Sequence, residues 1–464
     1  MNWHEKRVVV IGAARQGLAL TRYLVERGAQ VVLTDARPAG ELAGARQALA
    51  DLAVTWELGG HPFSLLDNAD IVCPSGGVPL TIPLVQEAIW RGIPLSNDSQ
   101  IFVDAAPCKV VGITGSAGKT TTTTLMGRIA QQAAEAGLYR QAFVGGNIGF
   151  PLVDRLDEIA ADDLAVVEFS SFQLELMTTS PQVAAILNIS PNHLDRHGTM
   201  EAYTAAKRNI YTHQHPEDIL VLGAEDEIAW SLAQDAPGRV LAFGRQIPDG
   251  QEGGFIRDGQ VWVRTGHGEQ AVTPLSEIAL LGEHNLLNVL AACTLGAALN
   301  LPADVIRAGV QGFGGVEHRL EFVRELNGVQ WYNDSKATSP GMTVTAMRAF
   351  SQPLVVLAGG RDKNLPWEGF AAQAKQQASQ VIAFGEAAGI VAAAFERAGV
   401  TDPRPVTAAG LEEAVSAAAQ LAQPGEVVLL APGGTSFDEF TDFEARGRRF
   451  KQLVHSLPEK ETKR

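Results

Sequence analysis

A glycine-rich segment in the first third of the chain has the composition of a phosphate-binding loop. The segment T114-G-S-A-G-K-T-T121 follows the aliphatic run VVGI and precedes the helical pattern TTTLMGRIA. Its core, G115-x-x-G118-K119-T120, is a shortened form of G-x-x-x-x-G-K-[ST], because Ile113 stands where that pattern has its first glycine. Successive backbone N–H groups of such a loop can cradle phosphates, Lys119 supplies a positive charge, and Thr120 can ligate Mg²⁺. The segment therefore predicts a nucleotide-phosphate site.

Two further polar residues follow predicted strands and could serve that site. Glu168 ends the run LAVVE, and His193 lies in S190-P-N-H-L-D-R-H-G198 after VAAILNI. In a parallel sheet, ligands bind beyond the carboxyl ends of the strands, where a carboxylate can help to hold a metal ion. The alternative for each residue is a solvated side chain at a strand end.

A lysine falls on the apolar face of a predicted helix. In TMEAYTAAKRNIYTH, Tyr203, Lys207, Ile210 and Tyr211 have the spacing of one helical stripe. Burial lowers the pKa of a lysine and favours its neutral amine. A neutral amine can add CO₂ to form a carbamate, whose oxygens suit Mg²⁺. The alternative is a lysine that extends its ammonium group to water.

The N-terminal segment has a second glycine turn that could bind an anion. The strand VVVIG leads into G12-A-A-R-Q-G17 and a helix, and the next strand ends at Asp35. Ala14 replaces the middle glycine of the dinucleotide fingerprint G-x-G-x-x-G, which disfavours NAD. A helix N-terminus after a tight turn still favours an anion, so another nucleotide or a nucleotide sugar is the main expectation, and a turn without a ligand is the alternative.

The chain from residue 281 onward carries several polar clusters, and four of them follow predicted strands. LGEHNLLN (281–288) begins a helix, with Asn285 and Asn288 in its first turns or Asn285 as its cap. Further on come Arg319 in EHRLE, the segment D334-S-K-A-T-S-P-G341, Lys363 in LAGGRDKN, and PGGTSFDEFTDFEARG. Clusters that follow parallel strands converge on one edge of the sheet.

The elements that position these residues alternate between short aliphatic runs and amphipathic helical patterns. This alternation predicts an α/β fold with mostly parallel sheets. The stretch 240–275 instead predicts an antiparallel insertion, and domain boundaries are expected near residues 98 and 315. The expected strands are 7–11, 30–34, 70–73, 109–113, 164–168, 183–189, 219–222, 354–358, 380–384 and 426–431.

Composition excludes several classes of function. The chain has 464 residues, of which 46% are hydrophobic, and a formal net charge of −15, which disfavours nucleic acid as a partner. Its apolar runs are too short for a transmembrane helix, and its N-terminus lacks the features of a signal peptide. Cys73, Cys108 and Cys293 are too scattered for a disulfide framework, so we expect a cytoplasmic protein without membrane insertion.

The motifs resemble those of the Mur ligase family from about residue 5 to about residue 455. The resemblance is carried by TGSAGKTT, EFSSFQLE, ILNISPNHLDRHG, AAKRNIY, EHNLLN, EHRLE, NDSKAT, LAGGRDKN and SFDEFTDFEARG. It implies three domains: a Rossmann-like domain for the UDP substrate (1–97), a central P-loop ATPase-type domain with a mostly parallel sheet (98–315), and a Rossmann-like domain for the amino acid (316–464).

NDSKAT resembles most closely the family members that add D-glutamate. The resemblance implies that ATP phosphorylates the carboxylate of UDP-N-acetylmuramoyl-L-alanine and that the amine of D-glutamate attacks the acyl phosphate, in peptidoglycan precursor synthesis. It also implies ATP and two Mg²⁺ ions as cofactors, small molecules as the only partners, and a monomer.

The resemblance assigns roles to individual residues. Those implied to bind ATP are Gly115, Ser116, Ala117, Gly118, Lys119, Thr120, Thr121, Asn285, Asn288, Arg319 and Asp334. Those implied to surround the metals are Thr120, Glu168, His193 and a carbamylated Lys207. Those implied to contact the UDP substrate are Ala14, Arg15, Gln16, Asp35, Arg37, Asn147 and Ser170. Those implied to hold D-glutamate are Thr338, Lys363, Ser436 and Phe443. Lys336 is implied to lie near the reacting groups, and the further residues implied to be catalytic are Lys119, His193 and Lys207.

Three other functions compete with this one. Another amino-acid-adding ligase of the family would use a different amino acid. A P-loop NTPase switch would hydrolyse nucleotide without any amino acid, but it would not need the polar clusters from residue 281 onward. An NAD-dependent oxidoreductase would rest on the first glycine turn alone.

Overall fold

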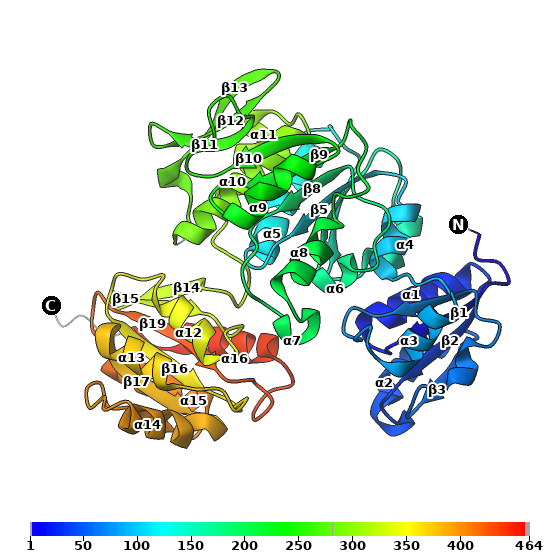
Figure 1. Cartoon of the computed structure of the whole chain (residues 1–464). Coiled ribbons are helices and arrows are strands. Elements are labelled where there is room, and N and C mark those ends of the chain that lie inside the picture. The colour runs from blue at the N-terminus through cyan, green and yellow to red at the C-terminus, as the bar shows by residue number, and fades with distance from the viewer. Residues whose placement is uncertain (1, 281, 460–464) are drawn as a thin grey trace. The chain divides into compact units, whose positions relative to one another are not determined.

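The computed structural model describes residues 2–280 and 282–459 (Figure 1). Its chain forms two compact units, each considered by itself below. The first unit runs to Ile278 and resumes over His284–Phe313, and the second takes Ala279–Glu283 and the chain from Gly314 onward.

The first unit opens with a four-stranded parallel sheet of order β3-β2-β1-β4. Its strands are β1 (Arg7–Ile11), β2 (Gln30–Asp35), β3 (Thr55–Leu58) and β4 (Ile71–Pro74). Helix α1 (Arg15–Glu26) connects β1 to β2, and the other helical segments are η1 (Ala39–Leu42), α2 (Ala43–Ala48), η2 (Phe63–Leu66) and α3 (Pro83–Trp90). Strand β3 was not expected from the sequence, because its residues are only half-buried and the segment lacks an aliphatic run.

The same unit contains a nine-stranded sheet of order β13-β12-β11-β10-β9-β8-β5-β7-β6. Its parallel strands are β5 (Lys109–Thr114), β6 (Ala142–Gly146), β7 (Leu164–Glu168), β8 (Val183–Ile186), β9 (Ile219–Gly223), β10 (Arg239–Phe243) and β11 (Gly253–Arg257). Strands β12 (Gln260–Thr265) and β13 (Gly268–Pro274) continue it antiparallel to β11, which confirms the expected antiparallel insertion.

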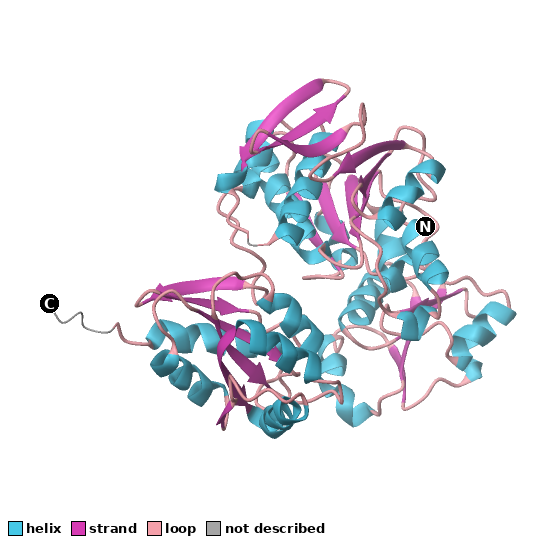
Figure 2. Ribbon diagram, turned by 60° about the vertical axis from the view of Figure 1, so that its left-hand side comes forward, coloured by secondary structure: helices cyan, strands magenta, loops and turns pink. Residues whose placement is uncertain are grey.

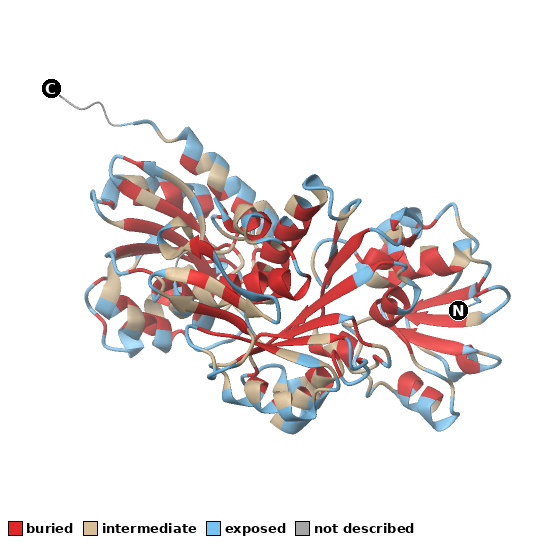
Figure 3. Cartoon of the chain, turned by 90° about the horizontal axis from the view of Figure 1, so that it is seen from above, coloured by how far each residue is buried: buried red, intermediate tan, exposed pale blue. Residues whose placement is uncertain are grey.

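Helices cover this sheet and close its core. They are α4 (Asp98–Ala105), α5 (Lys119–Glu135), η3 (Leu152–Glu158), α6 (Ser171–Leu174), α7 (Leu194–His197), α8 (Met200–Arg208), α9 (Glu227–Ser231), η4 (Leu232–Asp235), η5 (Leu275–Glu277), α10 (Glu283–Ala298) and α11 (Ala303–Val310). Helix α5 packs closely on α11, where any side chain at Gly309 would overlap Ile129. Figure 3 shows that most strands of this sheet are buried along most of their length. Strands β12 and β13 are the exceptions, since most of their residues are half-buried or exposed.

Two expectations about element length were wrong. Strand β8 ends at Ile186 rather than at residue 189, because the backbone carbonyl of Asn188 accepts from Ser116 and the chain turns toward the glycine-rich loop. Helix α8 ends at Arg208, so Ile210 and Tyr211 complete the apolar stripe from the segment that follows the helix.

The second unit is a six-stranded sheet of order β14-β15-β19-β16-β17-β18. Strand β14 (Glu321–Leu326) is antiparallel to β15 (Val329–Asn333), and the others are parallel: β16 (Leu354–Gly359), β17 (Ala378–Phe384), β18 (Val406–Ala408) and β19 (Val427–Gly433). Helices α12 (Pro340–Met347), α13 (Glu368–Gln377), η6 (Gly385–Ala387) and α14 (Ala388–Arg397) pack on one face, and α15 (Leu411–Leu421) and α16 (Phe443–Ser456) on the other (Figure 2).

The predicted α/β class with mostly parallel sheets is thus confirmed. Within the described ranges, the chain has no helix that is both long and apolar enough to cross a membrane.

Candidate active site

The glycine-rich loop lies between the buried strand β5 and helix α5. Gly118 has φ +83°, and a side chain there would overlap the amide oxygen of Asn288. The position therefore requires glycine for both its backbone angle and its space. Strand, tight turn and helix N-terminus together direct backbone N–H groups toward an anion.

Asn188, which follows β8, fixes the shape of this loop. Its amide oxygen accepts from the backbone N–H of Ala117 at 2.8 Å, and its amide nitrogen donates to the Ala117 carbonyl at 3.1 Å. Ser116 is held in turn by Tyr203, whose hydroxyl lies 3.0 Å from the Ser116 hydroxyl. Asn188 was not predicted from the sequence, where its only signal is that a polar residue directly follows a buried strand.

Two lysines converge on the loop. The ammonium group of Lys119 donates to the carbonyl oxygens of Gly115 at 2.8 Å and Ser116 at 3.2 Å. The amine of Lys207 donates to the same Gly115 carbonyl at 2.9 Å and to the Thr114 hydroxyl at 3.3 Å. The structure therefore brings Lys207 from helix α8 to the predicted phosphate loop.

Lys207 is only 1% exposed, which excludes the alternative of a lysine that extends to water. Burial lowers its pKa well below the usual value, the charge of Lys119 lowers it further, and Glu168 acts in the opposite direction. The amine is thus held in surroundings that favour its neutral form.

Glu168 is also buried and carries an unsatisfied atom. One carboxylate oxygen accepts from the Asn147 amide nitrogen at 2.8 Å, whereas Oε2 is buried with no hydrogen-bond partner among the described residues. A buried carboxylate oxygen without a donor is costly unless a cation or water meets it. The solvated alternative for Glu168 is wrong, and the site suits a cation.

His193 and His197 both contact the ring of Phe172, and His193 lies near Lys119. The His193 ring meets Phe172 edge-on at 5.0 Å, and the His197 ring stacks on it at 5.1 Å. His193 is an exposed residue, and the burial of part of its ring and the nearby Lys119 lower its pKa. A neutral imidazole is the form that binds a metal ion.

Asn288 joins helix α10 to the glycine-rich loop. The Thr122 hydroxyl donates to its amide oxygen at 3.3 Å, and its amide nitrogen donates to Asn285 at 3.0 Å. The structure thus brings both asparagines to the N-terminal turn of α5, as their predicted contact with a nucleotide requires.

Five of the predicted UDP-substrate residues lie at the carboxyl edge of the first sheet, whereas Asn147 and Ser170 follow β6 and β7 of the nine-stranded sheet. Asp35 accepts from the Ala13 backbone N–H at 2.8 Å and from the Arg37 guanidinium at 2.8 and 3.0 Å. The hydrogen bonds from Arg37 hold the pKa of Asp35 well below its usual range. Gln16 accepts from the Gly76 backbone N–H at 3.3 Å, and Ala14 and Arg15 form the start of α1.

Ser170 lies close to Gly76 and is fixed by a capping box. Its hydroxyl accepts from the Gln173 backbone N–H at 3.2 Å, while the Gln173 side chain accepts from the Ser170 backbone at 2.9 Å. A side chain at Gly76 would lie 3.9 Å from the Ser170 hydroxyl.

Arg196, which was not predicted as a site residue from the sequence, connects the histidine segment to the loop after β4. Its guanidinium donates to the carbonyl oxygens of Gly76 and Gly77 at 3.3 Å and of Val78 at 3.1 Å. It also lies over the Phe172 ring at 3.9 Å.

A second group of predicted residues meets at the carboxyl edge of the sheet in the second unit. Lys363, after β16, donates to the Thr338 hydroxyl at 3.2 Å. Lys336 lies 5.9 Å from the centre of the Phe443 ring, and Ser436 is buried after β19. The expected convergence of these clusters is thus confirmed within this unit.

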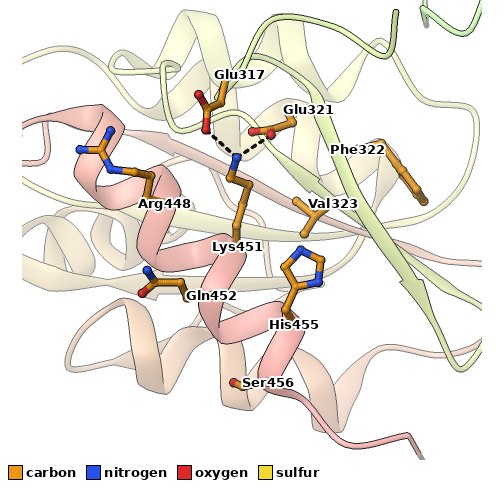
Figure 4. A pocket seen from close by; sticks show the side chains of 9 residues that line it. All are labelled: Glu317, Glu321, Phe322, Val323, Arg448, Lys451, Gln452, His455 and Ser456. Carbon is orange, nitrogen blue, oxygen red and sulfur yellow. Dashed lines mark hydrogen bonds and ion pairs between the residues drawn. The ribbon is translucent and has the colours of Figure 1, made fainter. Parts of the chain in front are cut away.

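Asp334 is the buried carboxylate of this group. It accepts from the Leu320 backbone N–H at 3.2 Å, next to Arg319, and burial raises its pKa to about 6. Its neighbour Asn333 donates to Glu321, which is held by Lys451 of α16 at 2.8 Å. Figure 4 shows Lys451 between Glu317 and Glu321. These three residues are among those that line an open groove with a volume of about 710 Å³.

The mostly parallel α/β fold and the two groups of site residues are the features expected of a Mur ligase. Comparison with models of protein families supports the same class of protein. Models of a Mur ligase MurD-like N-terminal domain, a Mur ligase middle domain, and a Mur ligase glutamate ligase domain match residues 6–97, 113–296 and 318–434. The chain belongs to the Mur ligase family.

Among its relatives are two bacterial enzymes named UDP-N-acetylmuramoylalanine--D-glutamate ligase. The one from Symbiobacterium thermophilum is 41% identical over 454 residues, which are 98% of each chain. The one from Koribacter versatilis is 39% identical over 465 residues and covers 100% of each chain.

Solved structures of more distant proteins share the fold. The UDP-N-acetylmuramate-alanine ligase MurC of Thermotoga maritima is 19% identical, with a TM-score of 0.57 over 98% of this chain and 100% of that chain. MurF from Acinetobacter baumannii is 20% identical, with a TM-score of 0.57 over 96% of this chain and 93% of that one.

Proposed function

We propose that this chain is an ATP-dependent ligase that adds D-glutamate to UDP-N-acetylmuramoyl-L-alanine in peptidoglycan precursor synthesis. The observation that carries the proposal is the convergence of the glycine-rich loop, the buried Lys207 and the buried Glu168 at one sheet edge. The substrates in this proposal are inferred from the names of the relatives that match the whole chain.

The proposed reaction has two steps. A carboxylate oxygen of the substrate attacks the γ-phosphorus of ATP, the bond from that phosphorus to the bridging oxygen breaks, and ADP leaves. The amine of D-glutamate then attacks the acyl carbon, a C–N bond forms, and phosphate leaves with the bonding electrons while the nitrogen loses a proton. Positioning and charge neutralisation supply most of the catalysis in such phosphoryl transfer.

In the first unit, we assign the phosphates of ATP to residues 115–121, with Lys119 as the main cation. We also assign Asn285 and Asn288 of α10, which are joined by a hydrogen bond, to the nucleotide. We assign the UDP substrate to the residues at the first sheet's edge together with Asn147 and Ser170.

Two Mg²⁺ ions would neutralise charge on the phosphates. The residues that would hold these ions are Thr120, Glu168, His193 and Lys207. The unpartnered Glu168 Oε2 fits this assignment. The described residues contain no cluster of three or more His, Cys, Asp or Glu side chains that could hold a metal. Mg²⁺ commonly takes only one or two protein carboxylates and completes its shell with phosphate and water oxygens. A carbamate on Lys207 would supply a further oxygen.

In the second unit, we assign D-glutamate to Thr338, Lys363, Ser436 and Phe443, because a lysine with one buried and one half-buried hydroxyl suits a dicarboxylate. Arg319, Asp334 and Lys336 would serve ATP and the reacting groups from this unit. We further infer that the enzyme works as a monomer in the cytoplasm, where its three free, buried cysteines stay reduced.

Phosphate release with ATP, UDP-N-acetylmuramoyl-L-alanine and single amino acids tests the proposal. We expect release with D-glutamate to exceed that with L-alanine or L-lysine, and to disappear in Lys119→Ala. Equal release with all three would refute the specificity, and release without any amino acid would favour an NTPase switch.

A further inference from the structure

Arg446 is a fully buried arginine in the first turns of helix α16. Its Nε donates to the Ser335 hydroxyl at 3.0 Å, and its two Nη atoms donate to the carbonyl oxygens of Thr435 at 3.0 Å, Ser335 at 2.9 Å and Gly434 at 3.1 Å. None of these four acceptors is a carboxylate. Burying a charge is costly unless its polar atoms are satisfied, and these four hydrogen bonds offset that cost.

The acceptors belong to two loops that carry predicted site residues. Ser335 lies between Asp334 and Lys336 after β15, and Thr435 directly precedes Ser436 after β19. The Ser335 hydroxyl, which accepts from Arg446, also donates to the Phe443 carbonyl at 2.8 Å. One guanidinium therefore connects both loops to the first turn of α16.

A third loop is joined to the same point. The backbone N–H of Arg361 donates to the Thr435 carbonyl, and that of Thr435 donates to the Arg361 carbonyl, each at 2.8 Å. Gly360 has φ +93°, and a side chain there would lie 2.8 Å from an Nη atom of Arg446. The chain thus leaves room for the guanidinium beside the loop that leads to Lys363.

We propose that Arg446 is a positioning residue that sets the geometry of the amino-acid-binding loops, which deepens the proposed function and rests on it. The guanidinium is planar and carries five donors in a fixed arrangement, so it can bridge several carbonyl oxygens at once, whereas a lysine ammonium is a point charge. Displacing catalytic or binding groups by about 1 Å can cost about 100-fold in rate.

The test measures steady-state kinetics of Arg446→Lys and Arg446→Met with each substrate varied in turn. We expect the KM for D-glutamate to rise by about tenfold or more in both variants, while the KM for UDP-N-acetylmuramoyl-L-alanine, assigned to the first unit, stays unchanged. A merely structural role would reduce kcat through a smaller active fraction and leave every KM as in the wild type, and that result would overturn the proposal.

Arg449→Met is the matched control. Arg449 lies on the same helix, is 44% exposed, and pairs with Glu412 at 2.8 Å, so its loss should leave every KM unchanged. If the Arg446 variants do not fold, Ser335→Ala decides, because it removes the hydroxyl between Arg446 and Phe443. An unchanged KM for D-glutamate in Ser335→Ala would then overturn the proposal. A wild-type enzyme without D-glutamate-dependent phosphate release would instead refute the proposed function itself.

Discussion

At the scale of single residues, the site contains two buried ionisable side chains whose polar atoms or charges are incompletely satisfied by other protein groups. Lys207 faces another lysine across the glycine-rich loop, and Glu168 has a buried oxygen that meets no donor among the described residues. Each arrangement is costly in isolation. Both costs fall if a carbamate forms on Lys207 and cations lie between the two groups.

Lys207→Ala tests the proposed carbamate. We expect kcat to fall by about 100-fold, because an anionic oxygen donor near the transferred phosphoryl group is lost. Short carboxylates such as acetate, diffusing into the vacated space, should restore part of the activity. The measurement is phosphate release with and without added carboxylate, with Lys109→Ala as the control because Lys109 is exposed on β5. Full activity of Lys207→Ala would refute the carbamate.

Asp98 provides a test of pH-dependent stability outside the site. It is buried at the start of α4, and burial raises its pKa to about 6 from 3.8. Because the folded state holds this proton up to a higher pH than the unfolded state, the free energy of unfolding decreases as pH rises from about 4 to about 6. The shift corresponds to about 3 kcal/mol.

We therefore expect Asp98→Asn to be more stable than the wild type at neutral pH, by up to about 3 kcal/mol, and equally stable near pH 4. Urea unfolding across this pH range measures the difference. Asp104→Asn, an exposed position on the same helix, should show no such trend. A constant difference between Asp98→Asn and wild type at every pH would contradict the prediction.

At the scale of elements, the sequence predicted the strands whose aliphatic runs are fully buried and the polar residues that end them. Glu168, Asp334 and the glycine-rich loop were found in this way, because a strand and the residue after it are local signals. The contacts that shape the loops were not found. Asn188 and Arg446 act on backbone atoms 71 and 111 residues away, and neither has a local pattern that marks its partner.

Arg196 is a third residue whose hydrogen-bond partners are distant in the sequence. We expect it to couple its own loop to the loop of residues 76–78. Its three hydrogen bonds hold residues 76–78 near Gln16 and Ser170, where we place the UDP substrate. We expect Arg196→Ala to raise the KM for that substrate about tenfold, since hydrogen bonds from a charged donor contribute about 1.5–3 kcal/mol each. The KM for D-glutamate should not change. Arg208→Ala, which removes an exposed pair with Asp235, is the control, and equal effects in both variants would contradict the prediction.

At the scale of the whole molecule, a protein with a net charge of −15 is proposed to bind anionic nucleotides. Net charge disfavours nucleic acid as a partner, but it does not reveal local cations. In the first unit these are Lys119 and the α5 N-terminus, and in the second Lys336 and Lys363. The proposed ATP contacts fall on both units, which neither composition nor any single motif indicates.

This division predicts a change in scattering on ligand binding. A nucleotide that contacts Lys119 and Asn288 on the first unit and Arg319 and Asp334 on the second would favour the arrangements of the two units that allow all four contacts. We expect the radius of gyration to decrease when Mg²⁺, a non-hydrolysable ATP analogue and the UDP substrate are added together.

Two variants separate this effect from simple ligand binding. Lys119→Ala should lose nucleotide affinity and keep the radius of the free protein. Arg319→Ala retains every contact assigned to the first unit, so it should still bind nucleotide but show a smaller decrease in radius, because the ligand then favours the shared arrangements less strongly. Identical scattering curves for the free and liganded wild type would place all nucleotide contacts on the first unit, and the roles proposed for Arg319 and Asp334 would then be wrong.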